Sequence, residues 1–588
     1  LNHQHLMLHF LLNNWILLFG KCGTTIFQKI KMSEKKNLTI KETFALAVQN
    51  HQKNNLKVAE NLYKKILRTN PNHFGSIFYL GTLFVQIKRF DLAKSLLQKA
   101  IQIKINYAPA HSNLGGTLKE LGEYEEAIDH CQKAIQIDPN YADAYNNLGA
   151  SLKEMGELQK AVDSYQKAIQ IQPNFEDAHI NLGAAFQQIG DIHKAIKCYQ
   201  KLSKIQSNLG NVYSGLGGLY VVLGDTQKAT SSYQNALKYE PDNLVFYYHL
   251  IDLNKEILNL NLKNKIDRII NDSNCTKKNL AYGNFLLSKY AQKDKNYKKE
   301  FDYLIKGHQY YFKTQETKHK KQLNFWLNEL PYIKELFDFN RPKKEIKKIN
   351  HKIRPIFIVG VPRCGSTLVE KIIASGANYI PTGEETAIIS SFVNHKLLKK
   401  QSLNFEIENF RIKLYEMYKQ KRLIQEENDF TFTDKTLDNF FYIGFIKEIF
   451  PHAKVINCKR SSIASIVSIL KNNLPDIPWA HNLEHIFKYF DIYHRTIENY
   501  KKIFPNFIYE LELEKLVEDP ENESKKLMKF CDLSWDKKCL EFYKRKDLIS
   551  RTTSNLQIRK AIYKHSEKRY LPYKQFLKEY GDKYSWYN

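Results

Sequence analysis

A short loop of small and charged residues is the first part of this sequence that could do chemistry. Gly360 and Gly365 have four residues between them, the glycine spacing of a loop that binds a nucleoside triphosphate. Ser366 stands where such loops carry a lysine, and without it the chain lacks the usual means of neutralising a γ-phosphate. Arg363 offers a bidentate charge instead, beside the hydroxyl groups of Ser366 and Thr367. The loop is therefore expected to bind a phosphate-like anion without hydrolysing ATP.

The segments on either side of this loop predict how it is held. Residues 355–361 (PIFIVGV) form a short apolar run typical of a buried strand, and residues 368–373 (LVEKII) have helical periodicity. A strand, a glycine-containing loop and a helix together present backbone N–H groups and a helix N-terminus to a phosphate. The sequence thus predicts an α/β domain at this point in the chain.

Residues 362–368 (PRCGSTL) resemble the 5′-phosphosulfate loop of the sulfotransferases. The resemblance is strongest to the tyrosylprotein sulfotransferases and the bacterial tetratricopeptide sulfotransferases. It implies that the co-substrate is 3′-phosphoadenosine 5′-phosphosulfate and that the transfer needs no metal. The donor-binding residues of the loop would be Arg363, Cys364, Gly365, Ser366 and Thr367. Cys364 stands where serine is usual in the family and is small enough to fit.

Two adjacent glutamates follow the loop. An acceptor hydroxyl must lose its proton as it attacks sulfur, so a sulfotransferase needs a general base. Residues 383–386 (GEET) match the Gly-Glu-Glu-Thr of the tyrosylprotein enzymes, in a register that favours Glu385 over Glu384 without excluding the latter. The arginine that follows this motif in those enzymes is Ala387 here, which speaks against a tyrosine-specific acceptor site. The alternative is that both glutamates lie on a solvated loop and have no catalytic role.

The resemblance also implies a cation for the leaving phosphate and a second phosphate site. Residues 433–440 (TDKTLDNF) are similar to the family segment whose lysine touches the bridging oxygen, so Lys435, together with Arg363, would stabilise the developing charge. Arg460, at the end of a predicted strand, and Ser468 match the pair that holds the 3′-phosphate. Near the C-terminus, Arg559, Ser566 and Lys568 are candidates for adenine and 3′-phosphate contacts, while Leu513 replaces a tyrosine common in the family.

The first half of the chain is repetitive. Alanine recurs every 34 residues at Ala59, Ala93, Ala127, Ala161, Ala195 and Ala229, and glycine recurs on the same spacing at Gly122, Gly156, Gly190 and Gly224. Small residues allow two helices to approach closely, and glycine permits the turn between them. This spacing is that of a tetratricopeptide repeat, a unit that mostly binds other proteins.

Three asparagines occupy the same place in successive repeats. Asn113, Asn147 and Asn181 fall on the first helix, which lines the concave face in this repeat family. A ladder of amides could hold an extended acceptor peptide by its backbone, as in the similar ladder of the O-linked N-acetylglucosamine transferases. The alternative is asparagine tolerated on an exposed helix.

These patterns predict a multidomain fold: an all-α tetratricopeptide solenoid followed by an α/β P-loop-like sulfotransferase domain, with a central parallel sheet and flanking helices. The expected boundaries are six repeats over 39–244, a degenerate helical cap over 245–341, a linker over 342–354 and the sulfotransferase domain over 355–588. Residues 1–31 are interpreted as an over-extended gene model ahead of Met32, with a signal peptide or membrane anchor as the alternative.

Composition adds bounds on partners and location. The formal net charge of +27 indicates either a lysine-rich solvated surface or an electrostatic field that attracts anionic ligands. The basic residues are spread along the whole chain rather than gathered in one arm, so a nucleic-acid partner is not expected. The eight cysteines show neither metal-ligand nor disulfide spacing, which is typical of a reducing compartment. A cytoplasmic bacterial protein is therefore expected, membrane-anchored only if the first 31 residues are genuine.

The predicted function is sulfuryl transfer to an acceptor hydroxyl, with a protein or peptide tyrosine held by the repeats as one acceptor. Saccharide and small-molecule hydroxyls stay open, because acceptor pockets vary within one fold. The alternatives are a peptide-binding repeat scaffold whose transferase domain is inactive, and a nucleotide kinase, which the missing lysine disfavours.

Overall fold

The structure is a computed structural model that describes residues 38–205, 209–333, 353–376, 380–398, 407–424, 431–545, 547–548, 550, 558–562 and 567–587. The segment predicted as a leader, residues 1–31, lies outside these ranges, as do residues 342–352 of the predicted linker. The chain divides into two compact units, the first ending at Ala185 and the second beginning at Phe186.

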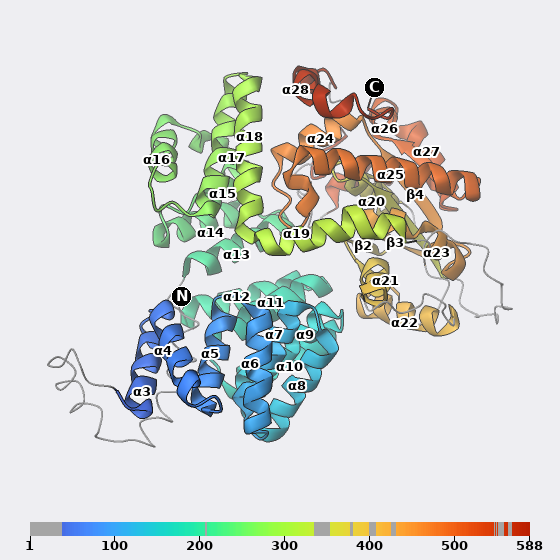
Figure 1. Ribbon diagram of the computed structural model, residues 1–588. Coiled ribbons are helices and arrows are strands. Elements are labelled where there is room, and N and C mark those ends of the chain that lie inside the picture. Colours follow the sequence, from blue (N-terminus) through green and yellow to red (C-terminus); the bar gives the residue numbers. More distant parts are fainter. Residues whose placement is uncertain are drawn as a thin grey trace. The chain divides into compact units, whose positions relative to one another are not determined.

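A series of short helices fills residues 40–239, as the 34-residue spacing predicts (Figure 1). In chain order they are α3 (Ile40–Gln52), α4 (Leu56–Thr69), α5 (Phe74–Gln86), α6 (Phe90–Ile103), α7 (Ala108–Leu121), α8 (Tyr124–Ile137), α9 (Ala142–Glu154), α10 (Leu158–Ile171), α11 (Glu176–Ile189), α12 (Ile192–Ile205), α13 (Leu209–Leu223) and α14 (Thr226–Tyr239). The repeated alanines are fully buried, at 0% exposure. At Gly149 on α9, a Cβ atom would lie 2.7 Å from the ring of Tyr165 on α10, so the helices of this pair approach closely.

The turn after the first helix of each pair has a positive φ. The positions are 34 residues apart and are Asn54, Lys88, Gly122, Gly156, Gly190 and Gly224. The predicted turn role of glycine is therefore confirmed at the last four, whereas the first two repeats place residues with a Cβ in the same left-handed conformation. Such a conformation is strained for a lysine because its Cβ crowds the following carbonyl.

Further helices follow the repeats. They are α15 (Leu244–Leu253), η1 (Lys255–Ile257), α16 (Leu260–Ile270), α17 (Lys277–Lys293), α18 (Tyr297–Phe312), η2 (Lys313–Gln315), α19 (Glu316–Asn324), the π-helical turn η3 (Phe325–Glu329) and η4 (Leu330–Tyr332). We call residues 244–333 the helical cap.

A five-stranded parallel sheet follows the cap. Its strands are β1 (Arg354–Gly360), β2 (Thr382–Glu384), β3 (Thr431–Lys435), β4 (Lys454–Lys459) and β5 (Ile508–Glu512), in the order β2-β3-β1-β4-β5. The register pairs Glu384 with Lys435 and Gly360 with Cys458. Since ligands of parallel sheets bind at the carboxyl ends of the strands, these pairs mark the edge where a site is expected.

Helices flank this sheet (Figure 1). They are α20 (Ser366–Ala374), α21 (Ile388–Leu398), α22 (Ile407–Gln420), η6 (Leu437–Tyr442), α23 (Ile443–Ile449), α24 (Ser462–Lys471), η7 (Pro478–His481), α25 (Leu483–Ile503), α26 (Leu513–Glu518), α27 (Pro520–Phe530), η8 (Lys537–Lys544), η9 (Glu567–Tyr570) and α28 (Leu571–Gly581). The helix α20 packs against β1 and β3, and Tyr493 of α25 donates a hydrogen bond to Asn457 of β4 at 2.6 Å. The predicted fold class, a helical repeat array followed by an α/β domain with a parallel sheet, is confirmed.

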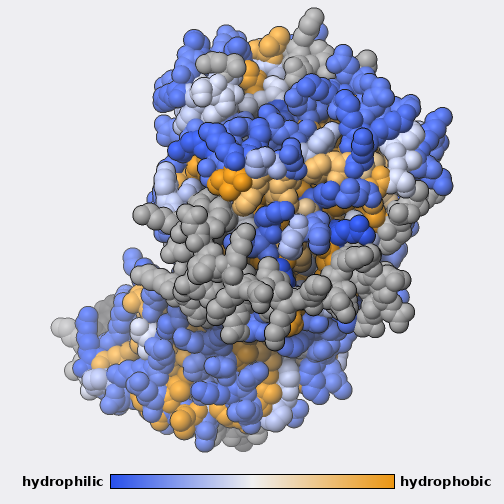
Figure 2. Space-filling model, turned by 90° about the vertical axis from the view of Figure 1, so that its right-hand side faces the viewer, coloured by the Kyte–Doolittle hydropathy of each residue, from blue (hydrophilic) through white to orange (hydrophobic). Residues whose placement is uncertain are grey.

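The helical cap and the α/β domain belong to the same compact unit. The buried carboxylate of Glu300 on α18 accepts a hydrogen bond from Tyr573 of α28 and lies 2.9 Å from Lys471 Nζ of α24. In the view of Figure 2, most of the described surface is hydrophilic, with hydrophobic areas among it.

Candidate active site

The loop between β1 and α20 turns sharply and ends at a helix whose N-cap residue is a glycine. The backbone φ is 152° at Gly360, 70° at Arg363 and 96° at Gly365. A Cβ at Gly365 would lie 2.7 Å from Leu513 Cδ1, so the position requires glycine for space as well as conformation. The helix α20 begins at Ser366, and its N-cap residue, Gly365, has no side chain that could accept a hydrogen bond from the first turn. The predicted strand–loop–helix arrangement is present, with a helix N-terminus suited to an anion.

Arginines from distant parts of the sequence meet beside this loop. Arg363 Nε donates to Ser468 Oγ at 3.0 Å, and Arg460 Nη1 donates to the carbonyl of Arg363 at 3.0 Å. Arg460 Nη2 donates to Tyr570 Oη at 2.9 Å, and Arg569 donates to the same oxygen. Burial and the neighbouring Arg460 lower the pKa of Arg363 to about 10. The structure thus brings together Arg363, Arg460 and Ser468, as the resemblance implies, and adds Arg569 and Tyr570.

Lys435 is buried at the end of β3 and contacts the loop. Its Nζ lies 2.6 Å from Glu384 Oε1 and donates to Thr367 Oγ1 at 3.1 Å. Burial alone would lower the pKa of Lys435, but the carboxylates of Glu384, Glu370 and Glu385 raise it, so the amine is held charged. Ser550 also donates to Glu384 Oε1, at 2.8 Å. Glu384 is therefore committed to Lys435 and Ser550.

Glu385 has different surroundings from those of Glu384. It lies just past β2 with φ at 52°, is exposed and lines the cavity described below. Its backbone N–H donates to the carbonyl of Lys435 at 3.2 Å, which ties the turn to β3. Ala387, where the family pattern has arginine, lines the same cavity.

A buried carboxylate fixes the turn that carries Glu385. Asp434 accepts hydrogen bonds from Thr386 Oγ1 at 2.7 Å, Tyr418 Oη at 2.6 Å and the backbone N–H of Thr436 at 3.1 Å. Burial raises the pKa of Asp434 although these hydrogen bonds oppose the shift. Sequence reasoning missed this role, and the only signal was the aspartate beside Lys435 in the matched segment.

The phosphate loop, the arginines beside it, Lys435 and Glu385 line one cavity of about 680 Å³, a size typical of ligand sites. Its described lining includes Arg363, Ser366, Thr367, Glu385, Lys435, Arg460, Ser468, Lys560 and Arg569. Gly365 and Leu513 also line it. Trp326 of the helical cap is a further lining residue that no sequence pattern indicated.

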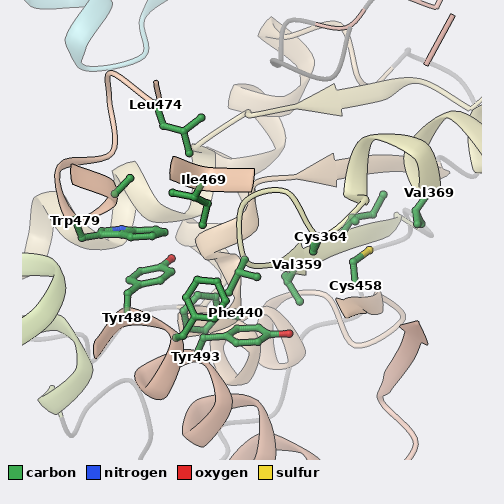
Figure 3. Close-up of a cluster of buried hydrophobic side chains, with 14 of the residues drawn as sticks. Val359, Cys364, Val369, Phe440, Cys458, Ile469, Leu474, Trp479, Tyr489 and Tyr493 are labelled. Atoms are coloured by element: carbon green, nitrogen blue, oxygen red, sulfur yellow. The ribbon is translucent and has the colours of Figure 1, made fainter. Parts of the chain in front are cut away.

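Cys364 lies buried beneath the loop, next to Cys458 of β4 (Figure 3). A hydrogen bond with Cys458 and the backbone N–H of Ser366 hold the pKa of the Cys364 thiol below its usual value, against the effect of burial. Cys364 does not line the cavity among the described residues, so its place in the structure is one of packing under the loop.

None of the three predicted C-terminal contacts to the donor is found among the described residues. Arg559 is absent from the described cavity lining, and its Nη2 donates instead to the carbonyl of Val222 at 3.2 Å, at the turn between α13 and α14. Ser566 and the side chain of Lys568 lie outside the described residues.

The three asparagines of the repeats are engaged within the first unit. Asn113 Nδ2 donates to Thr82 Oγ1 at 3.1 Å, Asn147 Nδ2 to Ser112 Oγ at 3.1 Å and Asn181 Nδ2 to Asn146 Oδ1 at 2.9 Å. Each amide thus connects its helix to the corresponding helix of the preceding repeat.

Among the helices that the structure describes, none is both long and apolar enough to cross a membrane. Within the described residues, no group of three or more His, Cys, Asp or Glu side chains is placed to hold a metal ion.

The fold agrees with comparisons to protein families. Residues 355–537 match the sulfotransferase family, and residues 106–174 and 176–209 match the tetratricopeptide repeat. The chain therefore carries tetratricopeptide repeats ahead of a segment that matches the sulfotransferase family.

An uncharacterized protein of Aquifex aeolicus (strain VF5) is 29% identical over 334 residues, which are 53% of this chain and 42% of that protein. The chain thus spans less than half the length of this relative. Among solved structures, MamA is 32% identical, covering 27% of this chain and 92% of MamA with a TM-score of 0.25. A tetratricopeptide-repeat protein of Thermus thermophilus is 20% identical, covering 31% of this chain and 98% of that one with a TM-score of 0.28.

Proposed function

We propose that this chain transfers the sulfuryl group of 3′-phosphoadenosine 5′-phosphosulfate to an acceptor hydroxyl. The observation that carries the proposal is the convergence of Arg363, Arg460 and Arg569 on one cavity at the start of α20. Neither Arg460 nor Arg569 has a carboxylate partner among the described residues. Like charges held this close repel one another, and a ligand with phosphate groups at two positions would relieve the repulsion.

In this proposal the donor has two anchoring points. The phosphosulfate lies in the loop, against the backbone N–H groups of Ser366 and Thr367 at the start of α20. The 3′-phosphate lies against Arg460, while Ser468 holds Arg363 Nε in place. The described residues fit such a donor because every group named is a hydrogen-bond donor or a cation in the same cavity.

Glu385 acts as the general base. It takes the proton of the acceptor hydroxyl as the acceptor oxygen bonds to sulfur. The bond between sulfur and the bridging oxygen breaks, and the leaving phosphate keeps that electron pair. Lys435, held charged beside Thr367, stabilises the phosphate charge as it develops. Glu384 serves as the counterion of Lys435, which would make it a poor base.

The repeats hold the acceptor in this proposal, as a protein or peptide segment that presents a tyrosine. The support is the presence of tetratricopeptide repeats, which mostly bind proteins. Because the amide nitrogens of Asn113, Asn147 and Asn181 donate within the array, a bound peptide would meet the amide oxygens of this ladder.

The test uses the full chain. Calorimetric titration with 3′-phosphoadenosine 5′-phosphate should show binding that the Arg363→Ala variant loses. ATP with Mg²⁺ should bind more weakly than this nucleotide. Donor labelled in its sulfate, followed by mass spectrometry of products from cells with and without the gene, should identify sulfated acceptors. Absence of nucleotide binding would leave a peptide-binding scaffold with an inactive domain.

A further inference from the structure

The cavity has one end that is aromatic and acidic rather than cationic. Trp326, Leu474, Trp479, Tyr489 and Asp438 line it there. The rings of Trp479 and Tyr489 stack with centroids 3.8 Å apart and planes inclined by 14° (Figure 3). Burial is the main cause that raises the pKa of Tyr489 and that of Asp438; the charge of Asp438 adds to the first shift and the charge of Glu385 to the second, as expected for groups that lie near one another. The base of the proposed reaction therefore borders a surface suited to a flat ring.

The helical cap helps to build this end. Trp326 lies on the π-helical turn η3, and its ring is 6.0 Å from that of Phe441 on η6. The segment that precedes Trp479 is held by cap residues: Asn473 donates its Nδ2 to Tyr282 Oη at 3.1 Å and its backbone N–H to Tyr248 Oη at 3.4 Å. Trp326 lies outside residues 355–537, which match the sulfotransferase family, so the family match does not account for this part of the wall.

Two carboxylates at this end lack a cation. Asp438, on the first turn of η6, and Asp476, on the segment before η7, both line the cavity, and neither forms an ion pair with any described residue. The described cations of the lining are the arginines of the donor site, Lys560 and Lys435, and Lys435 is already paired with Glu384. In a chain with a formal charge of +27, a ligand cavity with two carboxylates without described ion pairs is unexpected. The carboxylate of Asp438 is half-buried beside apolar surface, where its charge is unfavourable until a cation arrives, whereas Asp476 is exposed at the rim and adds attraction for that cation.

We propose that the acceptor is a phenol that carries a positive charge close to its ring. This inference rests on the sulfotransferase function proposed above. The ring lies against Trp326 and the stacked pair of Trp479 and Tyr489, and the hydroxyl meets Glu385. The cationic group faces Asp438 and Asp476. A phenolic amine and a tyrosine beside lysine or arginine in a peptide share this chemistry.

The first experiment compares three phenols of similar size with the full chain and a saturating donor. Tyramine is cationic, 4-ethylphenol is its neutral counterpart and 4-hydroxyphenylpropionate is anionic. We expect kcat/KM for tyramine to exceed that for 4-ethylphenol by about tenfold or more, and the anionic phenol to be the poorest. Equal values, or preference for the anionic phenol, would overturn the proposal. The second part of the experiment uses peptides in which tyrosine is flanked by lysine, alanine or glutamate. A higher kcat/KM for the lysine-flanked peptide than for tyramine would indicate a protein acceptor, and a lower one would indicate a small phenolic amine.

Variants connect the preference to the cavity. Asp476→Asn and Asp438→Asn should each reduce the tyramine to 4-ethylphenol ratio several-fold, whereas Asp302→Asn on the exposed face of α18 should not change it. Trp326→Leu should raise KM for all phenols while leaving the affinity for 3′-phosphoadenosine 5′-phosphate unchanged. An unchanged ratio in both aspartate variants would contradict the proposal.

Nucleotide titration keeps the two proposals apart. If the chain does not bind 3′-phosphoadenosine 5′-phosphate, the sulfotransferase function itself fails. If the chain binds the nucleotide and sulfates phenols without preferring the cationic ones, only the acceptor assignment fails. The same conclusion holds if it binds the nucleotide but sulfates none of these phenols and peptides.

Discussion

Lys435 Nζ lies 2.6 Å from Glu384 Oε1, and both side chains are almost completely buried, at 2% and 6% exposure. The parallel register of β2 and β3 places these two residues opposite each other. Glu385, one residue further on, lies beyond the strand and faces the cavity instead. The end of β2 thus gives two neighbouring carboxylates different surroundings, which fit the different roles proposed for them.

Exchanging each carboxylate for an amide should separate these roles. Glu385→Gln should lower kcat by about 10²-fold or more, because the general base is lost, while the affinity for 3′-phosphoadenosine 5′-phosphate and the unfolding midpoint stay unchanged. Glu384→Gln should instead lower the free energy of unfolding by ~3 kcal/mol, because it leaves Lys435 buried without its partner. Steady-state kinetics, nucleotide titration and urea unfolding of both variants provide the comparison. Full activity in the double variant would contradict the assignment of the base.

A second prediction concerns the turn that carries Glu385. Thr386 donates to the buried Asp434 at 2.7 Å, and removing a hydrogen bond to a charged group costs about 1.5–3 kcal/mol. Thr386→Val should therefore lower kcat about tenfold or more with unchanged nucleotide affinity, as the base loses its position. Thr386→Ser keeps the hydroxyl and should restore most of the activity. Equal losses in the valine and serine variants would show that the methyl group, rather than the hydrogen bond, matters.

A third prediction tests the second phosphate site. Arg460→Ala should weaken binding of 3′-phosphoadenosine 5′-phosphate by about 10- to 100-fold, since a charged hydrogen bond is lost, but should hardly affect adenosine 5′-phosphate. Lys459→Ala is the matched control: it removes the same charge one residue earlier, from a side chain that lies 3.5 Å from Glu510. Calorimetry with both nucleotides measures the difference. A similar loss for the two nucleotides would place Arg460 away from the 3′-phosphate.

The sequence predicted the features that rest on local spacing. The 34-residue grid indicated the helices, and the pattern around Gly360 and Gly365 indicated β1, the loop and α20. Features that depend on strand register, or on distant segments of the chain that meet in the fold, were not predictable. The pairing of Glu384 with Lys435 is one of them, because it joins residues on different strands. Arg569, Tyr570 and Trp326 reach the cavity from segments without any motif. Arg559, chosen on resemblance, lies against the turn between α13 and α14 because it belongs to a segment whose path no local pattern determines.

The repeats offer a test of backbone strain. Lys88 occupies the left-handed turn position that glycine occupies in the later repeats, with φ at 59°. Lys88→Gly should raise the free energy of unfolding by ~0.5–1 kcal/mol, as relief of about 1–2 kcal/mol of strain outweighs the added freedom of the unfolded chain. Gly122→Ala is the reciprocal change: a new Cβ there would meet nothing within 4 Å, so its destabilising effect isolates the backbone. Thermal unfolding followed by circular dichroism measures both, and a destabilised Lys88→Gly variant would contradict the argument.

The carboxyl of Asp438 should make stability depend on pH. Burial, followed by the carboxylates of Asp434 and Glu385, raises the pKa of Asp438 from 3.8 to about 7. Because the folded chain then binds this proton more tightly than the unfolded chain, the contribution of Asp438 to stability is lost as pH rises from about 4 to about 7. Asp438→Asn cannot titrate, so its free energy of unfolding should fall less between pH 5 and pH 8 than that of the unchanged chain. Identical slopes in urea unfolding across this range would contradict the shift.

The same ionisation should affect the choice of acceptor. Above pH 7 the carboxylate of Asp438 is charged and attracts a cationic phenol, and below it the neutral carboxyl does not. The ratio of kcat/KM for tyramine to that for 4-ethylphenol should therefore increase from pH 6 to pH 8. Because both phenols use the same base, titration of Glu385 cancels in this ratio, as do the effects of Tyr442 and Tyr489, which also face Asp438. In Asp438→Asn the ratio should stay constant over this range, and a ratio that still rises there would assign the pH dependence to another group.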